Sequence, residues 1–402
     1  MSTGRPPVFD ELLRTDSTPA RHGESSYEFL NRVAGDFWSH ERDLVQAWAD
    51  RVGDPHYADL RARLRSRDNH EFNSAFLELY LHEAFRAGGY TVIVHPAVAD
   101  SPRRPDFWAE RDGRGMYVEA IAPGATPRAK AAANRRRVLF DTVNSVRDPN
   151  FFLWLDELSD GEAPPSGAAL RRDLRAWLRT LAPDDYADLD QAPTFRWVQD
   201  GWSATFKAIP KAEHARGPAG ADERAIGVFA HQPVQIVDDA PAIRAALVEK
   251  AGAYGNLEAP YVIAVGLYIF DHDHWHSTAA LYGAEALQIG VTDDGERTSR
   301  LVRNSDGFFG APPDWANADV SGVILVNQLQ PHSVLSADVI LWRHPAPLHP
   351  LPDDLQLPVH QVRFVAGRLV GDEPKCAAAA HFGLPDPWPP GEPWPNTPTR
   401  KG

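Results

Sequence analysis

Three carboxylates in the first third of the chain lie in local sequences that place them on regular elements. Glu78 falls in an apolar helical pattern, Asp106 follows a proline, and Glu119 lies in a short apolar stretch soon afterwards. Carboxylate oxygens are the ligands that Mg²⁺ and Mn²⁺ prefer. Two or three of them holding such a metal beside a phosphate can activate water and neutralise developing charge. We therefore interpret these residues as a candidate metal-binding cluster.

The element that must position Glu78 is a helix predicted over residues 71–87, ending at Gly88-Gly89. Glu78 and His82 share a polar stripe with Glu71 and Ser74, within about 80° at 100° per residue. The other sides of the helix are apolar, so it should be largely buried, and its polar stripe should face a cleft. The alternative is an ordinary stripe that faces solvent.

Asp106 and Glu119 are expected on a β-hairpin. Residues 90–95 predict a first strand, and two further short strands flank a turn at Asp112-Gly113. Because strand side chains alternate, Glu119 should share one face with Tyr117 and Ile121. A helix over residues 127–146 and a strand over 151–155 follow. This order of helix, three strands, helix and strand indicates a mixed α/β layer fold.

The segments Phe76-Leu77-Glu78-Leu79, Pro105-Asp106-Phe107 and Tyr117-Val118-Glu119-Ala120-Ile121 resemble the motifs of the PD-(D/E)xK superfamily of restriction-endonuclease-like nucleases. The resemblance covers roughly residues 70–155. It implies a restriction-endonuclease-like mixed sheet flanked by helices, and hydrolysis of phosphodiester bonds in DNA or, second, RNA. By this resemblance Asp106 and Glu119 bind Mg²⁺ or Mn²⁺, and Glu78 completes the site.

One position departs from the family pattern. The motif lysine should stand at position 121, where this chain has Ile121, a residue that can neither orient water nor stabilise a phosphorane. Members of the superfamily relocate or replace this lysine, and the candidates near in sequence are Lys130, Arg104 and His82. Otherwise catalysis has been lost, and the chain is an inactive module that binds nucleic acid or a protein partner.

A second candidate site alternates ligand-type side chains within residues 271–276. On an extended strand His272, His274 and His276 would share a face and could hold zinc. That pattern makes a zinc-binding protein the third hypothesis. The alternative is a polar loop after the apolar strand predicted over residues 261–270.

Charge limits the possible partners. The net charge of −14 argues against a protein that coats nucleic acid, because phosphate binding draws on Lys and Arg. Basic residues nevertheless surround the acidic cluster, and Arg103, Arg104, Arg135 and Arg136 are the expected phosphate contacts. An ordinary solvated arginine-rich helix face is the alternative. Nucleic acid is the expected partner, with a protein partner or a second copy of the chain as alternatives.

The domain organisation follows from composition. Residues 1–25 are expected to form a poorly ordered polar arm, 26–67 a helical lead-in, 68–344 the α/β core with its elaboration, and 345–402 an extended Pro-rich tail. Trp388 and Trp394 are expected to attach this tail to the body. With no long apolar run, no secretory pattern at the start and a single cysteine, Cys376, no membrane is expected and the expected location is the cytoplasm.

Overall fold

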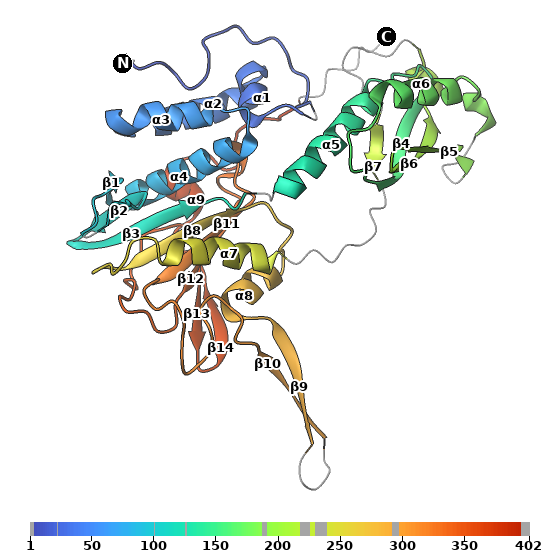
Figure 1. Ribbon diagram of the computed structural model, residues 1–402. Helices are drawn as coiled ribbons and strands as arrows, with labels where there is room; N and C mark the ends of the chain where they lie inside the picture. The colour runs from blue at the N-terminus through green and yellow to red at the C-terminus, as the bar shows by residue number, and fades with distance from the viewer. Residues whose placement is uncertain are drawn as a thin grey trace. The chain divides into compact units, whose positions relative to one another are not determined.

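The chain forms two compact units, each with its own core (Figure 1). The computed structural model describes residues 4–21, 23–99, 101–124, 127–186, 191–217, 226–229, 239–291 and 297–394. Unit 1 comprises residues 1–17, 25–123 and 238–402, and unit 2 comprises residues 18–24 and 124–237. The continuous core expected over residues 68–344 is therefore interrupted by an inserted unit.

Unit 1 is built on an eight-stranded mixed sheet in the order β1-β2-β3-β8-β11-β12-β13-β14. Strands β3, β8 and β11 are parallel, while β2 pairs with β3 and β12 pairs with β11 in antiparallel fashion. The strands are β1 (Thr91–Val94), β2 (Phe107–Arg111), β3 (Arg114–Ile121), β8 (Tyr261–Leu267), β11 (Gly322–Asn327), β12 (Asp338–Arg343), β13 (His360–Val365) and β14 (Arg368–Asp372). A separate hairpin joins β9 (Glu285–Val291) and β10 (Arg297–Arg303).

Helices cover both faces of this sheet. The first face packs against α1 (Ser26–Arg32), α2 (Asp36–Ala49), α3 (Asp54–Leu64) and α4 (Asn69–Ala87). The second face packs against α7 (Ala240–Ala251) and α8 (Trp275–Tyr282). Every residue of β8 is buried, as its apolar sequence predicts for a central strand covered on both faces. The fold is thus α/β with a large mixed sheet between helices.

The elements predicted around the carboxylates are confirmed. Helix α4 begins after Asp68, whose side chain accepts a hydrogen bond from the backbone of His70, and it ends at Gly88. It is buried on most sides, in keeping with its apolar sequence. The hairpin of β2 and β3 turns at Asp112 and Gly113, both with positive φ. The lead-in is helical, with Gly35 separating α1 from α2.

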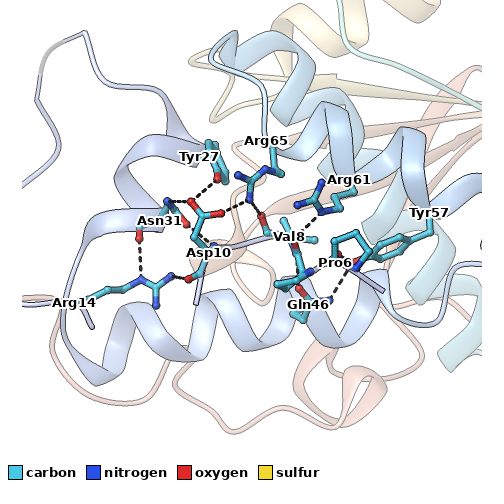
Figure 2. A network of polar contacts seen from close by, with 11 residues as sticks. Pro6, Val8, Asp10, Arg14, Tyr27, Asn31, Gln46, Tyr57, Arg61 and Arg65 are labelled. Carbon is cyan, nitrogen blue, oxygen red and sulfur yellow. Dashed lines mark hydrogen bonds and ion pairs between the residues drawn. The ribbon is translucent and has the colours of Figure 1, made fainter. Parts of the chain in front are cut away.

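The N-terminal arm differs from the expectation. Residues 4–17, here called the N-terminal strap, are docked on helices of unit 1, and Val8 and Phe9 are buried (Figure 2). Hydrogen bonds of 2.7–2.8 Å reach the strap carbonyls from the side chains of Tyr57 and Arg61 in α3 and of Arg65, which follows this helix. The polar composition was misleading because these bonds satisfy the backbone of the strap, which needs no regular structure of its own.

A charged cluster secures the next part of the strap. Asp10 forms an ion pair with Arg65 at 2.9 Å and accepts a hydrogen bond from the side chain of Asn31 at 2.9 Å (Figure 2). Hydrogen bonds from Arg65 and Asn31 lower the pKa of Asp10. Arg14 donates to the backbone carbonyls of Asn31 and Asp10. The strap therefore bridges α1 and the end of α3.

The docked strap predicts a stability effect. The substitution Phe9→Ala should lower the free energy of unfolding by about 3 kcal/mol, because Phe9 is 6% exposed and its ring stacks on Tyr27. The matched control is Leu13→Ala, since Leu13 is 90% exposed, and its effect should stay within about 0.5 kcal/mol. Chemical denaturation measures both, and equal effects would contradict a docked strap.

The C-terminal segment is also packed. Strands β13 and β14 complete the main sheet, and α9 (Ala378–Phe382) lies against α4. The expectation of a largely extended tail over 345–402 is therefore wrong for these residues. The indole of Trp388 donates to the carbonyl of Pro331 at 3.0 Å, and the ring of Trp394 lies 5.2 Å from that of Trp38. Attachment of the tail through these two tryptophans is confirmed.

Unit 2 has a four-stranded sheet in the order β5-β6-β4-β7. Its elements are α5 (Pro127–Asn144), β4 (Phe151–Ser159), α6 (Gly167–Leu178), β5 (Thr194–Gln199), β6 (Trp202–Pro210) and β7 (Ile226–Phe229). The helix and strand predicted after the hairpin thus exist, but they do not continue the sheet of the carboxylates. Within unit 1, the next helix and strand after β3 are α7 and β8. The elements α4, β1, β2, β3, α7 and β8 of this unit therefore follow the predicted order of helix, three strands, helix and strand.

None of the helices in the described ranges is long and apolar enough to cross a membrane.

Candidate active site

Asp106 lies directly before β2, at the start of the hairpin that β2 forms with β3. Its Oδ2 accepts a hydrogen bond from the backbone of Ala120 in β3 at 2.7 Å. No partner for Oδ1 is found among the described residues. Burial raises the pKa of Asp106 to about 8, and the charges of Glu119 and Glu78 add to this effect. Asp106 is therefore largely protonated at neutral pH when no cation is bound.

Glu119 is the most enclosed of the three carboxylates, at 3% exposure. It lies on the β3 face that packs against α7, as the predicted alternation requires, since Tyr117 and Ile121 pack into the core on that side. The Nζ of Lys250, in α7, donates to Glu119 Oε1 at 2.6 Å, and the hydroxyl of Tyr254 donates to Oε2. Both oxygens of this carboxylate thus have a partner from the α7 side.

Lys250 supplies a cation that the sequence interpretation missed. Burial lowers the pKa of Lys250, but the hydrogen bond and charge of Glu119, with the charge of Asp106, outweigh burial and raise it above its ordinary value. Lys250 is therefore protonated at neutral pH. It is 131 residues from Glu119 in the chain, beyond the inserted unit. The position expected for the lysine is filled by Ile121, which packs as core.

Glu78 lies on a different face of the sheet from Glu119 and pairs with its own arginine. It belongs to α4, on the opposite face of the sheet from Glu119, and it forms a two-pronged ion pair with Arg63 of α3, at 2.6 Å for each bond. Its hydrogen bonds raise the pKa of Arg63. Glu78 still acts on Asp106 through its charge. Glu78 therefore lies beside the site, and its charge is balanced by Arg63.

The oxygen atoms of Glu78, Asp106 and Glu119 are suitable ligands for a hard divalent cation, but the three side chains are not arranged to bind one ion together. Within the described ranges, no three His, Cys, Asp or Glu side chains are grouped so that they could hold a metal ion. The physical reason is that Glu78 and Glu119 lie on opposite faces of the sheet and each faces a cation. Asp106 and Glu119 remain the pair whose oxygens could hold Mg²⁺ or Mn²⁺, because a bound cation would offset the burial and the neighbouring carboxylate charges that raise the pKa of Asp106.

The other predicted catalytic residues are His82 and Lys130. His82 is buried in α4, and its Nδ1 lies 3.0 Å from the Oε1 of Glu83. Lys130 lies in α5 of unit 2, and its side chain is outside the described residues. Among the described residues, no hydrogen bond or ion pair joins His82 to Asp106 or Glu119.

The predicted phosphate contacts divide between the units. Arg103 and Arg104 are exposed and come just before Asp106, and Arg103 is near enough to influence Tyr254 by its charge. Arg135 and Arg136 belong to unit 2, where they bond to the Gly161 carbonyl and to Asp160. Arg103 and Arg104 thus belong to the same unit as the three carboxylates, and Arg135 and Arg136 belong to the other unit.

The histidines at 272–276 do not lie on a strand. His272 and His274 are in a turn, and His276 is in the first turn of α8. His274 forms a pair with Asp338 at 2.9 Å, while Asp271 accepts hydrogen bonds from the backbone at the start of α8. The shared face required for a zinc site is therefore absent, and the polar segment after β8 is a turn that starts a helix.

Comparison of the chain with protein-family models, with curated proteins and with solved structures gives no match.

Proposed function

We propose that this chain is a metal-dependent nuclease of the PD-(D/E)xK type that hydrolyses phosphodiester bonds, with DNA as the first candidate substrate. The observation that carries the proposal is the cluster of Asp106, Glu119 and Lys250. It combines a carboxylate directly before β2 and a carboxylate on the paired strand β3 with a lysine from α7. In this proposal Lys250 takes the role of the motif lysine that is missing at Ile121, and α7 and β8 are the helix and strand that follow the hairpin in the family order.

The roles of the side chains follow from their charges. Asp106 and Glu119 would hold Mg²⁺ or Mn²⁺, which when bound supplies an activated water and a positive charge at the phosphate. Lys250, held protonated by Glu119, stabilises negative charge on the phosphoryl oxygens rather than acting as a base. Arg103 and Arg104, exposed beside Asp106, are suited to contact the backbone of the nucleic acid.

The experiment is incubation of the purified chain with single- and double-stranded DNA and with RNA, in Mg²⁺, Mn²⁺ or EDTA. We expect cleavage only with the metal, and its loss in Asp106→Ala and Glu119→Ala. Glu110→Ala, which alters an exposed carboxylate on β2, is the matched control and should retain activity. Cleavage that persists in both site variants would reject the assignment.

One observation favours a second candidate, a nucleic-acid-binding module without turnover. Both oxygens of Glu119 already have partners in Lys250 and Tyr254, so this carboxylate is neutralised without a metal. Such a module would bind oligonucleotides equally well with and without divalent cations and would cleave none of them. The same assay, read by binding and by cleavage, separates the two candidates.

A further inference from the structure

A cavity of about 240 Å³ lies in unit 1 next to the candidate active site. Its apolar wall comes from the helices α3 and α4 and the strands β1 and β2, through Leu60, Leu79, Val94 and Phe107. Phe107 directly follows Asp106 in the chain. Glu78, whose charge acts on Asp106, also lines the cavity, so the cavity adjoins the Asp106 side of the site.

The polar wall of the cavity offers hydrogen bonds with little net charge. The ion pair of Arg63 and Glu78 lies in this wall, and Arg63 is balanced a second time by Asp59 at 2.9 Å. Burial lowers the pKa of His56, and the charges of His95 and Arg104 add to the effect, so His56 is neutral at pH 7. A phosphate would find no unbalanced cation here, and a metal ion would find no unpaired carboxylate.

His82 adds a ring nitrogen to the polar lining of the cavity. Glu83 is 2% exposed and also pairs with Arg51 and Arg86. Burial raises its pKa, but hydrogen bonds from His82 and Arg51 outweigh burial and lower it, so Glu83 is an ionised acceptor. The Nδ1 of His82 must then carry the proton in their 3.0 Å contact. Its Nε2 has no partner among the described residues, and His82 lines the cavity.

Aromatic surfaces complete the lining. The rings of His56 and His95 meet edge to face with centroids 5.1 Å apart, and Phe107 lies beside His82 with centroids 6.2 Å apart. The volume is below the range of about 300–1,000 Å³ that is typical for drug-sized ligands. The cavity is therefore suited to one flat, uncharged heterocycle with hydrogen-bonding edges.

The strap helps to fix this shape. His56, Leu60 and Arg63 follow one side of α3 and line the cavity, while Tyr57, Arg61 and Arg65 follow another side and bind the strap (Figure 2). The strap thus holds α3 in place from the side of the helix that does not line the cavity.

We propose that the cavity takes a single nucleobase, turned out of the strand whose phosphate lies at Asp106 and Glu119. This inference rests on the proposed function, and it adds how the substrate is held. A base removed from its stack needs aromatic surfaces and hydrogen-bonding groups, and this lining provides both. The same chemistry would admit a free nucleoside, so the test separates the two sources.

The test measures binding without cleavage, in EDTA, on the full chain. Fluorescence anisotropy follows a labelled single-stranded oligonucleotide, and ligand-observed NMR follows the free nucleosides. His56→Trp fills the cavity from a part-exposed position of α3, and Ala58→Trp adds the same bulk on the exposed side of that helix. We expect His56→Trp to weaken oligonucleotide binding at least tenfold and Ala58→Trp to change it less than twofold. Thermal melting confirms that both variants fold.

Each outcome decides the question. Equal binding by the His56→Trp variant and the unaltered chain would overturn the cavity assignment. Nucleoside binding that oligonucleotides do not displace would overturn the placement of a strand base and assign the cavity to a free nucleoside. If the cleavage assay fails while His56→Trp still weakens oligonucleotide binding, the nuclease proposal fails and the base pocket stands.

Discussion

Replacing Lys250 with methionine is expected to slow phosphodiester cleavage by about 10²–10³-fold, because a single preorganised charge donor at a reacting centre has an effect of this size. The substitution also leaves Glu119, which is 3% exposed, without its cation. Its charge would then be held only by the hydroxyl of Tyr254. Cleavage rates at saturating Mg²⁺, measured on the preferred substrate, test the expectation.

Two control variants separate catalysis from folding. Lys250→Arg keeps the charge beside Glu119 and should fold like the parent, while its longer planar group alters the contact with the phosphate. Glu249→Gln changes the exposed neighbour on α7 and should retain the parental rate. If Lys250→Met is well folded and cleaves at the parental rate, Lys250 does not replace the motif lysine.

The second large effect is on the free energy of unfolding, and it comes from a substitution that is expected to raise stability while removing activity. Asp106→Asn should abolish cleavage and make the protein more stable at alkaline pH. The pKa of Asp106 is raised from 3.8 to about 8, so between these values the unfolded chain has released a proton that the folded chain still holds. The stabilising contribution of the protonated carboxyl is complete below pH 3.8 and is lost as the pH rises to 8. Asparagine carries no such charge.

The size of this effect follows from the pKa. At about 1.4 kcal/mol per unit the raised pKa corresponds to about 6 kcal/mol, of which solvent screening at a part-buried site leaves roughly 2 kcal/mol. The stability difference between Asp106→Asn and the parent should therefore grow from near zero at pH 4 to its full value above pH 8. The asparagine oxygen can still accept the hydrogen bond from Ala120.

Thermal unfolding at pH 4, 7 and 9 provides the measurement. Asp112→Asn is the matched control, because Asp112 lies at an exposed turn with positive φ, a conformation that asparagine tolerates. Its difference from the parent should not change with pH. A stability difference for Asp106→Asn that is constant from pH 4 to pH 9 would contradict a raised pKa.

Local patterns in the sequence were enough to predict the elements that carry Asp106 and Glu119. The hairpin follows from alternation and a turn signal, and its pairing alone brings the backbone of Ala120 to Asp106. The buried character of α4 follows from its composition. These features depend on residues close together in the chain, so a single sequence contains the information.

The missed features depend on tertiary arrangement. Which face of the sheet α4 covers cannot be read from its periodicity, so the separation of Glu78 from Glu119 was not predictable. Lys250 was missed because an inserted unit separates it from Glu119. A weak signal existed, since the chain has only six lysines among its 41 basic residues and one of them ends the helix before the fully apolar strand β8.

The position of the inserted unit has a consequence for biosynthesis. Strand β3 pairs with β2 on one side and with β8 on the other, and the whole of residues 124–237 is translated between them. At 5–20 residues per second the ribosome takes roughly 10 s to pass from β3 to the end of β8. During that interval β3 is an open sheet edge on the nascent chain, which other strands can join. Correct folding in the cell thus depends on keeping neighbouring nascent chains apart until the central strand emerges.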